Sequence, residues 1–353
     1  MRRATGTVRG AGGIVLDTLI TGGTGLVGHH LVAALQARGD KVRAVVLPSE
    51  PTRWLEERGV RVYRGDITQP ATLQEPMRGV DVVFHLAALQ GAWLPIDAYY
   101  RVNVTGTEHV CRAAMAADVR RVVHVSSWTI YGMSCGKPVT EDQPPAPWKD
   151  PYWITKAEGD LLVQRLIASE GLRAAIIRPG TIFGAGDRLN FGRVANKLAT
   201  NRGLVIGRGR NALPLVYVTD VVQGLLLLAD NEKALGQAFN ISNDQPLTQL
   251  EFQNAIADAL GVAHPRLHVP YLAAYLLACA AERAISLTGQ THPVVTRHGV
   301  ILYGTDNQHS IDKARTQLGF VPQVSVLDGV QLAASWYAQE YATAATPVPA
   351  AAS

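Results

Sequence analysis

In the first half of the chain, short apolar runs alternate with segments of helical periodicity, and this alternation leaves few folds open. The apolar runs read as strands buried on both faces: 18–20, 42–47, 60–63, 80–88, 121–127 and 174–179. Amphipathic segments lie between them: 26–38, 69–78, 102–117 and 152–170. Strands and helices in strict alternation form βαβ units, so the sequence predicts an α/β fold with a doubly wound parallel sheet covered by helices on both sides.

After about residue 185 the alternation ends. Helical patterns are joined by short strands there: helices at 190–203, 220–229, 250–260 and 269–286, strands at 215–218 and 237–241. We expect one domain over residues 14–185 and a smaller, mostly helical lobe over 186–342, with elements at about 214–241 returning to the sheet. The two ends, 1–13 and 343–353, have the composition of disordered segments.

The composition excludes several classes of protein. With 47% hydrophobic and 18% charged residues among 353, the chain can bury a large core. Its net charge of +4 is small and its basic clusters are only pairs, Arg2-Arg3 and Arg120-Arg121, so no nucleic-acid partner is expected. No window holds the roughly 18 uninterrupted apolar residues of a membrane span. The remaining expectation is a partner of small-molecule size.

Cysteine and histidine positions predict no metal site. The three cysteines have no ligand spacing and cannot all pair, which fits a reducing, cytoplasmic location: Cys111, Cys135 and Cys279. His264 and His268 are four apart, but Pro265 interrupts a helical ligand pair. We therefore expect both histidines to be surface or structural residues.

A glycine-rich turn, TGGTGLVG, joins the first predicted strand to the first helix. Gly22, Gly25 and Gly28 allow a tight turn, the approach of backbone N–H groups to a pyrophosphate, and close packing of helix on strand. The helix begins at Leu26 and Val27, where its free N–H groups and positive dipole end attract phosphate. This turn predicts a site for NAD or NADP.

The sequence leaves the choice between NAD and NADP open. An acidic residue at the end of the second strand would bind the ribose 2'-hydroxyl of NAD, but that place holds Val46 and Leu47. Arg43 and Arg53 flank the place and read as surface residues rather than as a clamp for a 2'-phosphate.

The stretch PYWITK places a tyrosine and a lysine one helical turn apart. Asp150 is expected to cap the helix and Pro151 to open its first turn, so Tyr152 and Lys156 project from one face. The preceding strand ends in Ser126-Ser127, at the carboxyl edge where open α/β sheets bind ligands. Ser127 would face the ligand, whereas Ser126 would face the other side.

A glycine-rich dinucleotide turn, a serine at a strand end and Tyr-x-x-x-Lys on the next helix together resemble the short-chain dehydrogenase/reductases. The resemblance covers most of the chain and is strongest to the extended subfamily, which includes NAD-dependent epimerases and dehydratases. Further motifs match in order: GDI at 65–67, HLAA at 85–88, NVTGT at 103–107, RPGTIFGAGD at 178–187 and YVTDV at 217–221.

The resemblance implies a role for each matching residue. Residues expected to contact the cofactor, from the adenine to the nicotinamide, are Asp66, Ile67, Ala87, Ala88, Asn103 and Pro179. Tyr152 would be the general acid/base, and Ser127 would polarise the substrate carbonyl. Lys156 would hold the nicotinamide ribose and lower the pKa of Tyr152.

The expected substrate is a bulky apolar alcohol or ketone. Nucleotide-sugar enzymes of this subfamily carry Arg-Asp before the late strand, whereas this chain has Leu213-Pro214. The C-terminal stretch, and the loop with Gln90 and Trp93, resemble 3β-hydroxysteroid dehydrogenases and bacterial β-keto acid reductases. A nucleotide-sugar 4-epimerase or dehydratase, with Arg208 or Arg210 as the phosphate clamp, is the alternative; a cofactor-sensing regulator is disfavoured because the chain keeps Tyr and Lys.

Three helical segments are expected to form contacts at the surface of the protein. The apolar stretch 269–281 predicts a helix that packs over a pocket mouth or touches a membrane surface without crossing it. By the resemblance, the helices at 102–117 and 152–170 would form a homodimer.

Overall fold

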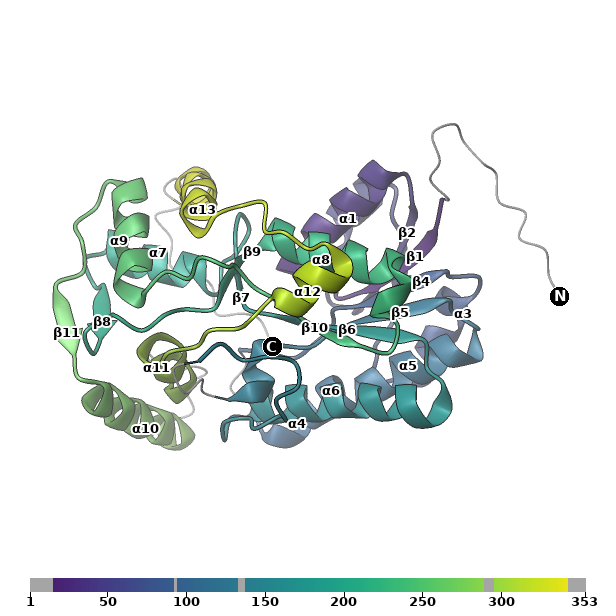
Figure 1. The fold of residues 1–353 in the computed structure, drawn as a ribbon, viewed down its shortest axis with the longest axis horizontal. Coiled ribbons are helices and arrows are strands. Elements are labelled where there is room, and N and C mark those ends of the chain that lie inside the picture. The colour runs from purple at the N-terminus through teal and green to yellow at the C-terminus, as the bar shows by residue number, and fades with distance from the viewer. Residues whose placement is uncertain (1–14, 92–93, 133–136, 289–294, 342–353) are drawn as a thin grey trace.

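The computed structural model describes residues 15–91, 94–132, 137–288 and 295–341. The expected terminal extensions, 1–13 and 343–353, lie outside this part of the chain. Seven strands, all paired in parallel, form the central sheet in the order β10-β6-β5-β4-β1-β2-β3 (Figure 1). Their bounds are Asp17–Thr21 (β1), Lys41–Val46 (β2), Arg61–Arg64 (β3), Val82–His85 (β4), Arg121–Val125 (β5), Ala174–Pro179 (β6) and Ala238–Ile241 (β10). The predicted doubly wound parallel sheet is confirmed.

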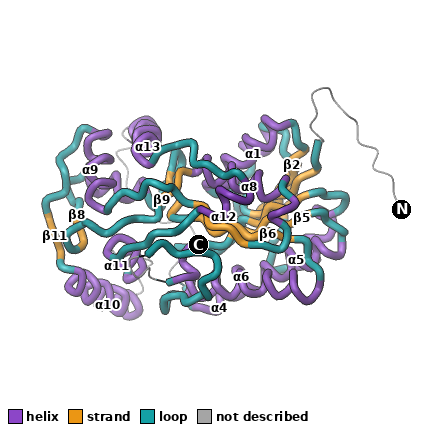
Figure 2. Tube along the Cα trace, viewed as in Figure 1, coloured by secondary structure: helices purple, strands orange, loops and turns teal. Residues whose placement is uncertain are grey.

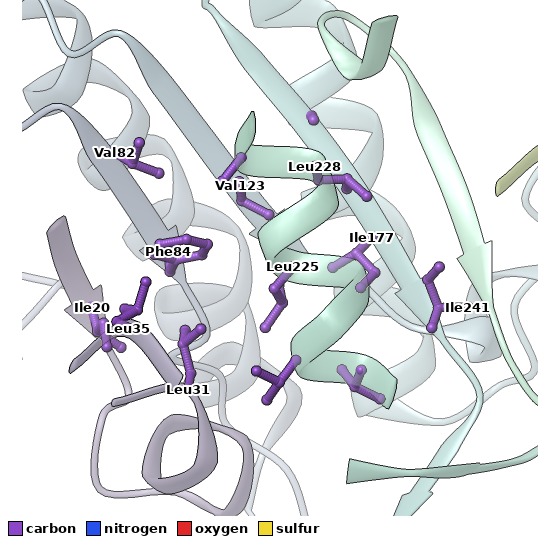
Figure 3. Packing of buried hydrophobic residues seen from close by; sticks show 14 of the residues in the cluster. Ile20, Leu31, Leu35, Val82, Phe84, Val123, Ile177, Leu225, Leu228 and Ile241 are labelled. Atoms are coloured by element: carbon purple, nitrogen blue, oxygen red, sulfur yellow. The ribbon is translucent and has the colours of Figure 1, made fainter. Parts of the chain in front are cut away.

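Helices cover both faces of this sheet because its strands are apolar on both sides. Successive residues of a strand point to opposite faces, and so Ile20 packs under α1 (Leu26–Arg38) and α8 (Val218–Asp230), whereas Leu19 packs under α5 (Thr107–Ala116) and α6 (Pro151–Glu170). Figure 3 shows the first layer, where side chains of α1 and α8 meet those of β1, β4, β5 and β6.

The C-terminal lobe lies at the end of the molecule opposite the N-terminal strands (Figures 1 and 2). One part packs Phe191–Ala199 (α7), Gln249–Leu260 (α9) and Val326–Tyr341 (α13) around the strand pair Thr181–Phe183 (β7) and Leu215–Tyr217 (β9). The other part joins Leu204–Ile206 (β8) and Leu267–Val269 (β11) to Tyr271–Thr288 (α10) and Arg297–Gly304 (α11). Shorter helical elements complete the described chain: Arg53–Glu57 (α2), Gln74–Met77 (α3), Ile96–Tyr100 (α4), Asp312–Leu318 (α12), and the turns Pro70–Leu73, Trp128–Tyr131 and Glu232–Ala234.

Several element boundaries differ from the prediction. The helix expected to begin at 269 begins at Tyr271, because Leu267–Val269 pairs with β8 and Pro270 then opens the helix. The segment 102–117 is not one regular helix, since Arg101–Gly106 forms a π-helical turn before α5. Helices α11, α12 and α13 lie outside the predicted helical segments. With eight and seven residues, α11 and α12 are too short to leave a clear periodicity in the sequence, whereas length does not explain α13, which has 16 residues.

Candidate active site

A cavity of about 1100 Å³ opens at the carboxyl edge of the central sheet, where the strand order reverses between β1 and β4. Ligands of open α/β folds bind at this switch point. Fourteen of the sixteen predicted site residues line it: Gly22, Gly25, Leu26, Val27, Gly28, Asp66, Ile67, Ala87, Ala88, Gln90, Ser127, Tyr152, Lys156 and Pro179. Asn103 lies behind the wall, and Trp93 lies outside the described residues.

The glycine turn leaves the start of α1 open toward this cavity. Gly22 has a φ of +74° and approaches β4 so closely that a Cβ there would lie 2.7 Å from the backbone N of Ala87. Gly25 caps α1 without a side-chain hydrogen bond, and no acidic residue occupies the first turn. Unpaired N–H groups in a first helical turn that carries no acidic residue of its own fit a pyrophosphate.

The end of the cavity below β2 and β3 is acidic. Asp66 is half-buried, and its Oδ1 accepts a hydrogen bond from the N–H of Thr68 at 2.8 Å. Glu50 also lines the cavity, and its Oε2 accepts a hydrogen bond from the hydroxyl of Thr24 in the glycine turn at 2.8 Å. Glu50 could not be predicted from the sequence, because it lies in the loop beyond Val46-Leu47, where the carboxylate is expected.

The loop that carries Glu50 is held in place by Arg64. The Arg64 guanidinium donates hydrogen bonds to the carbonyl oxygens of Leu47 at 3.2 Å and Glu50 at 2.7 Å, and to the Thr52 hydroxyl at 2.6 Å. These bonds turn the guanidinium toward the loop, and Arg64 does not line the cavity, so it offers no clamp for a 2'-phosphate.

The start of α6 brings the tyrosine and lysine to the cavity. Asp150 caps the helix, as predicted, and its Oδ1 accepts hydrogen bonds from the N–H groups of Tyr152 at 2.9 Å and Trp153 at 3.3 Å. The Lys156 Nζ donates to the carbonyl oxygen of Val125, at the end of β5, at 2.5 Å. This contact ties α6 to the strand that ends beside Ser127.

Ser127 is oriented by Thr129, a residue that no sequence motif marks. Its Oγ accepts hydrogen bonds from the N–H of Thr129 at 3.2 Å and from the Thr129 hydroxyl at 2.9 Å. Ser127 is also hydrogen-bonded to the side chain of Tyr152. Because Thr129 occupies the acceptor positions of the Ser127 hydroxyl, the Ser127 proton points away from Thr129 and can be donated to another group. Ser126 lines the cavity too, with its buried Oγ unpaired among the described groups.

Burial controls the pKa values of the tyrosine and the lysine. It raises the pKa of Tyr152 to about 12, and the hydrogen bond with Ser127 only partly opposes this shift. It also lowers the pKa of Lys156 to about 8, against the attraction of Asp160. The expectation that Lys156 lowers the pKa of Tyr152 is not met in the protein alone, because desolvation of the phenolate dominates and Lys156 points its Nζ at Val125.

A buried ion pair fixes the catalytic helix against the sheet. Arg178 on β6 forms two parallel hydrogen bonds with Asp160 on α6, from Nε at 2.9 Å and from Nη2 at 2.8 Å. The Arg178 Nη1 donates to the Tyr131 hydroxyl at 2.7 Å, which in turn donates to Asn240 Oδ1 at 2.9 Å. Asp160 lies two turns after Tyr152 and one after Lys156, so this network sets the position of both residues.

Asn103 supports the cavity wall from behind. Its side chain accepts a hydrogen bond from the N–H of Leu89 at 2.7 Å and donates to the Leu89 carbonyl at 3.0 Å and to Thr155 at 3.0 Å. It is 2% exposed, and these bonds use its amide. Asn103 therefore joins the segment after β4 to α6, and its contact with a cofactor stays a prediction.

The side of the cavity near the C-terminal lobe combines apolar side chains, such as Trp128 and Leu302, with polar ones, such as Arg188, Asn190 and Arg193. His298 on α11 also lines it, with its ring centre 6.5 Å from that of Tyr152. The Trp153 indole N–H donates to His298 Nδ1 at 2.7 Å, so the neutral imidazole carries its proton on Nε2. Burial lowers the pKa of His298, which favours this neutral form. No motif marks His298, because its role depends on packing against α6.

In the described part of the chain, no cluster of three or more His, Cys, Asp or Glu side chains could hold a metal ion. Nor is any helix in this part long and apolar enough to cross a membrane.

A doubly wound sheet with an open glycine turn at its switch point, and with Tyr, Lys and Ser beside that turn, defines an NAD(P)-dependent oxidoreductase of the Rossmann type. The sequence matches the NAD dependent epimerase/dehydratase family over residues 18–242, and the chain belongs to this family.

Known relatives support the same class. The chain is 31% identical over 334 residues to a 2-alkyl-3-oxoalkanoate reductase of Stenotrophomonas maltophilia, covering 90% of this chain and 98% of the relative. It is 29% identical over 325 residues to a 3β-hydroxysteroid dehydrogenase/Δ5→4-isomerase of Mycobacterium tuberculosis, covering 86% and 85%. Among solved structures, a dTDP-glucose 4,6-dehydratase from Streptomyces venezuelae with bound NAD superposes with a TM-score of 0.74 at 25% identity, covering 93% of this chain and 98% of that one. The predicted family resemblance is confirmed.

Proposed function

We propose that this enzyme transfers hydride between a nicotinamide cofactor and a secondary alcohol or ketone on a bulky apolar substrate, of the 3β-hydroxysteroid or long-chain β-hydroxy or β-keto acid type. The observation that carries the proposal is the juxtaposition of Ser127 and Tyr152 in a cavity that Trp128 and Leu302 also line. The names of the reductase and steroid dehydrogenase relatives support the same substrate classes.

The chain's own residues supply the proton and hold the substrate oxygen. In the reducing direction, Ser127 donates a hydrogen bond to the carbonyl oxygen, and Tyr152 transfers its phenolic proton to that oxygen as it gains negative charge. Because the pKa of Tyr152 is raised to about 12, the proton is present at neutral pH. When bound, the cofactor supplies the hydride that adds to the carbonyl carbon. Lys156, protonated at neutral pH, stabilises the phenolate that remains on Tyr152.

Glu50 favours NAD over NADP. A carboxylate hydrogen-bonded to Thr24, beside the glycine turn, would accept a hydrogen bond from a ribose 2'-hydroxyl and repel a 2'-phosphate. We expect Glu50→Gln to narrow the preference for NADH over NADPH by about tenfold, measured as the ratio of dissociation constants from tryptophan fluorescence. Glu57→Gln on the surface of α2 is the control; an unchanged ratio in Glu50→Gln would remove Glu50 from this role.

A nucleotide-sugar epimerase or dehydratase is the alternative. One observation disfavours this alternative and another favours it. Leu213 is 1% exposed and packs in the core of the lobe, and Arg208 and Arg210 do not line the cavity, so the expected phosphate clamps are missing. Arg188 and Arg193 do line it, and either could meet a substrate phosphate or the carboxylate of a keto acid.

The test is turnover by the native chain and by Tyr152→Phe. The native chain should oxidise NADH stoichiometrically with a β-keto acid or ketosteroid, whereas an epimerase would leave its cofactor unchanged over a cycle. Tyr152→Phe should bind NADH normally and lose at least about 100-fold in kcat, since general acid catalysis is removed. Turnover of UDP- or dTDP-sugars without net cofactor oxidation, or full activity in Tyr152→Phe, would refute the proposal.

The proposal also includes a cytoplasmic homodimer. In the described part of the chain Cys111 and Cys279 are free thiols, in keeping with a reducing compartment. The expected dimer helices, α5 and α6, pack on each other and are joined by an ion pair between Arg112 and Glu170. Sedimentation equilibrium would measure the dimer directly.

A further inference from the structure

The outer face of α10 is an exposed row of leucines. Leu272, Leu276 and Leu277 are 66%, 59% and 62% exposed, and Leu267 on the adjoining strand β11 is 60% exposed. The opposite face of the helix is buried, with Ala274 and Ala278 packed against Ile206 and Val300. The helix is thus anchored from one side while its leucines face solvent, at the outer edge of the lobe (Figure 1).

The surroundings of these leucines are basic. Segments 201–210 and 261–288 contain five arginines and one acidic residue, Glu282. Glu282 is only 8% exposed and is bound to Arg297. The five arginines are exposed and form no ion pair with another described residue: Arg202, Arg208, Arg210, Arg266 and Arg283.

The backbone brings these charges close to the leucines. Arg283 follows Leu272 by eleven positions, about three turns, and so lies on the same face of α10. Arg266 directly precedes β11 and Arg202 lies just before its partner β8. At the other end of the β8–β11 strand pair, Arg208 follows Gly207. The N–H of Gly207 donates to the carbonyl oxygen of Val269, the last residue of β11, just before α10 begins.

We propose that this surface docks on an anionic lipid membrane, with α10 lying in the interface and its leucines inserted among the acyl chains. An exposed leucine face beside cations is the pattern of helices that bind membrane interfaces, and arginine side chains can reach the phosphates while their stems cover apolar surface. A second copy of the chain fits less well, because a symmetric contact through this face would bring the same arginines together without acidic partners.

The docking surface connects to the cavity through the same helix. Glu282 lines the cavity from the inner side of α10. His298 and Leu302 line it from α11, which packs on α10, and Thr296 lines it from the N-cap of α11. A docked α10 would place this end of the cavity close to the bilayer, where apolar substrates concentrate. The docking itself rests only on the surface and does not depend on the proposed function.

The experiment is co-sedimentation of the full chain with vesicles of phosphatidylcholine, with or without phosphatidylglycerol. We expect binding to the mixed vesicles, at least about tenfold weaker binding to phosphatidylcholine alone, and loss of binding between about 0.05 and 0.5 M salt. Leu272→Gln/Leu276→Gln/Leu277→Gln should bind at least about tenfold more weakly. The matched control is Leu327→Gln/Leu332→Gln on α13, which changes leucines that are 54% and 50% exposed.

The contribution of the positive charges is tested by measuring vesicle binding of Arg266→Gln/Arg283→Gln, with Arg53→Gln on α2 as the control variant. Circular dichroism and turnover of a water-soluble ketone should be unchanged in all variants, because every altered side chain is exposed. Failure of the native chain to bind mixed vesicles would overturn the proposal. So would equal binding by the α10 and α13 leucine variants, or a dimer that the α10 variant dissociates while vesicle binding persists. Vesicle binding by a chain that reduces no ketone would refute the proposed function and leave the docking intact.

Discussion

Removing one charge of the Arg178–Asp160 pair should destabilise the whole sheet and misplace the catalytic helix. The side chains are 3% and 0% exposed, and the two parallel hydrogen bonds between them are 2.9 and 2.8 Å long. Asp160→Asn keeps the shape and the bond from Gln164, but leaves a buried guanidinium with no counter-charge. Breaking a buried pair in this way costs about 3–5 kcal/mol, against a total stability of about 5–15 kcal/mol.

A substitution of the other partner, Arg178, distinguishes the effect of losing the ion pair from the effect of losing a single hydrogen bond. Arg178→Met removes the charge but keeps most of the stem, and leaves the Asp160 carboxylate unpaired, so it should cost a similar amount. The double variant leaves neither charge buried alone, and its cost should therefore fall short of the sum of the single costs by at least about 2 kcal/mol. The exposed pair Arg53–Glu57, with side chains 90% and 61% exposed, is the control: Glu57→Gln should cost under about 0.5 kcal/mol.

Urea unfolding at neutral pH, followed by circular dichroism, measures these free energies, and the m-value checks that the denatured state is unchanged. The kcat of Asp160→Asn should fall by a larger factor than NADH affinity, because α6 carries Tyr152 and Lys156, whereas the glycine turn that would hold the pyrophosphate lies on another element. A cost below about 1 kcal/mol for Asp160→Asn, or additive single costs, would refute the view that this pair holds the helix.

Two further changes test the site itself. Lys156→Met should abolish turnover yet stabilise the protein at neutral pH. Because burial lowers the pKa of Lys156 from 10.5 to about 8, folding favours the neutral amine. The free energy of unfolding of the native chain should therefore rise between about pH 8 and 10.5, and the difference in stability between variant and native chain should shrink over the same range. Thermal unfolding across this range is the measurement, and a pH-independent difference would contradict it. His298→Leu should raise KM at least about fivefold for a ketone substrate with NADH binding unchanged, whereas an unchanged KM would mean that His298 only packs against Trp153.

The parts of the molecule that could be predicted from the sequence depend on local patterns. The strand and helix alternation, the glycine turn and the Tyr–Lys spacing are each written within a few consecutive residues, and the structure places them in one cavity. Glu50 and His298 could not be predicted in the same way. Glu50 reaches the cavity because Arg64 folds the loop after β2 back toward Thr24, and His298 does so because Trp153 holds its ring. Both depend on contacts between segments distant in sequence.

The sequence also could not show how the two faces of α10 differ. The apolar run predicts a helix that packs over a pocket mouth or touches a membrane surface, but it does not assign residues to faces. In the fold Ala274 and Ala278 are buried, with Tyr271 and Tyr275 partly buried beside them, whereas Leu272, Leu276 and Leu277 face solvent. Core packing alone would place large apolar side chains on the inner face, beside Tyr271 and Tyr275, and does not account for three leucines on the outer one. The small inner residues allow α10 to lie close to β8 and α11, and the outer leucines contribute nothing to that contact. Their presence on this face is therefore better explained by a partner surface than by the stability of the lobe, and the lipid docking proposed for α10 supplies one that also concentrates apolar substrate at the cavity.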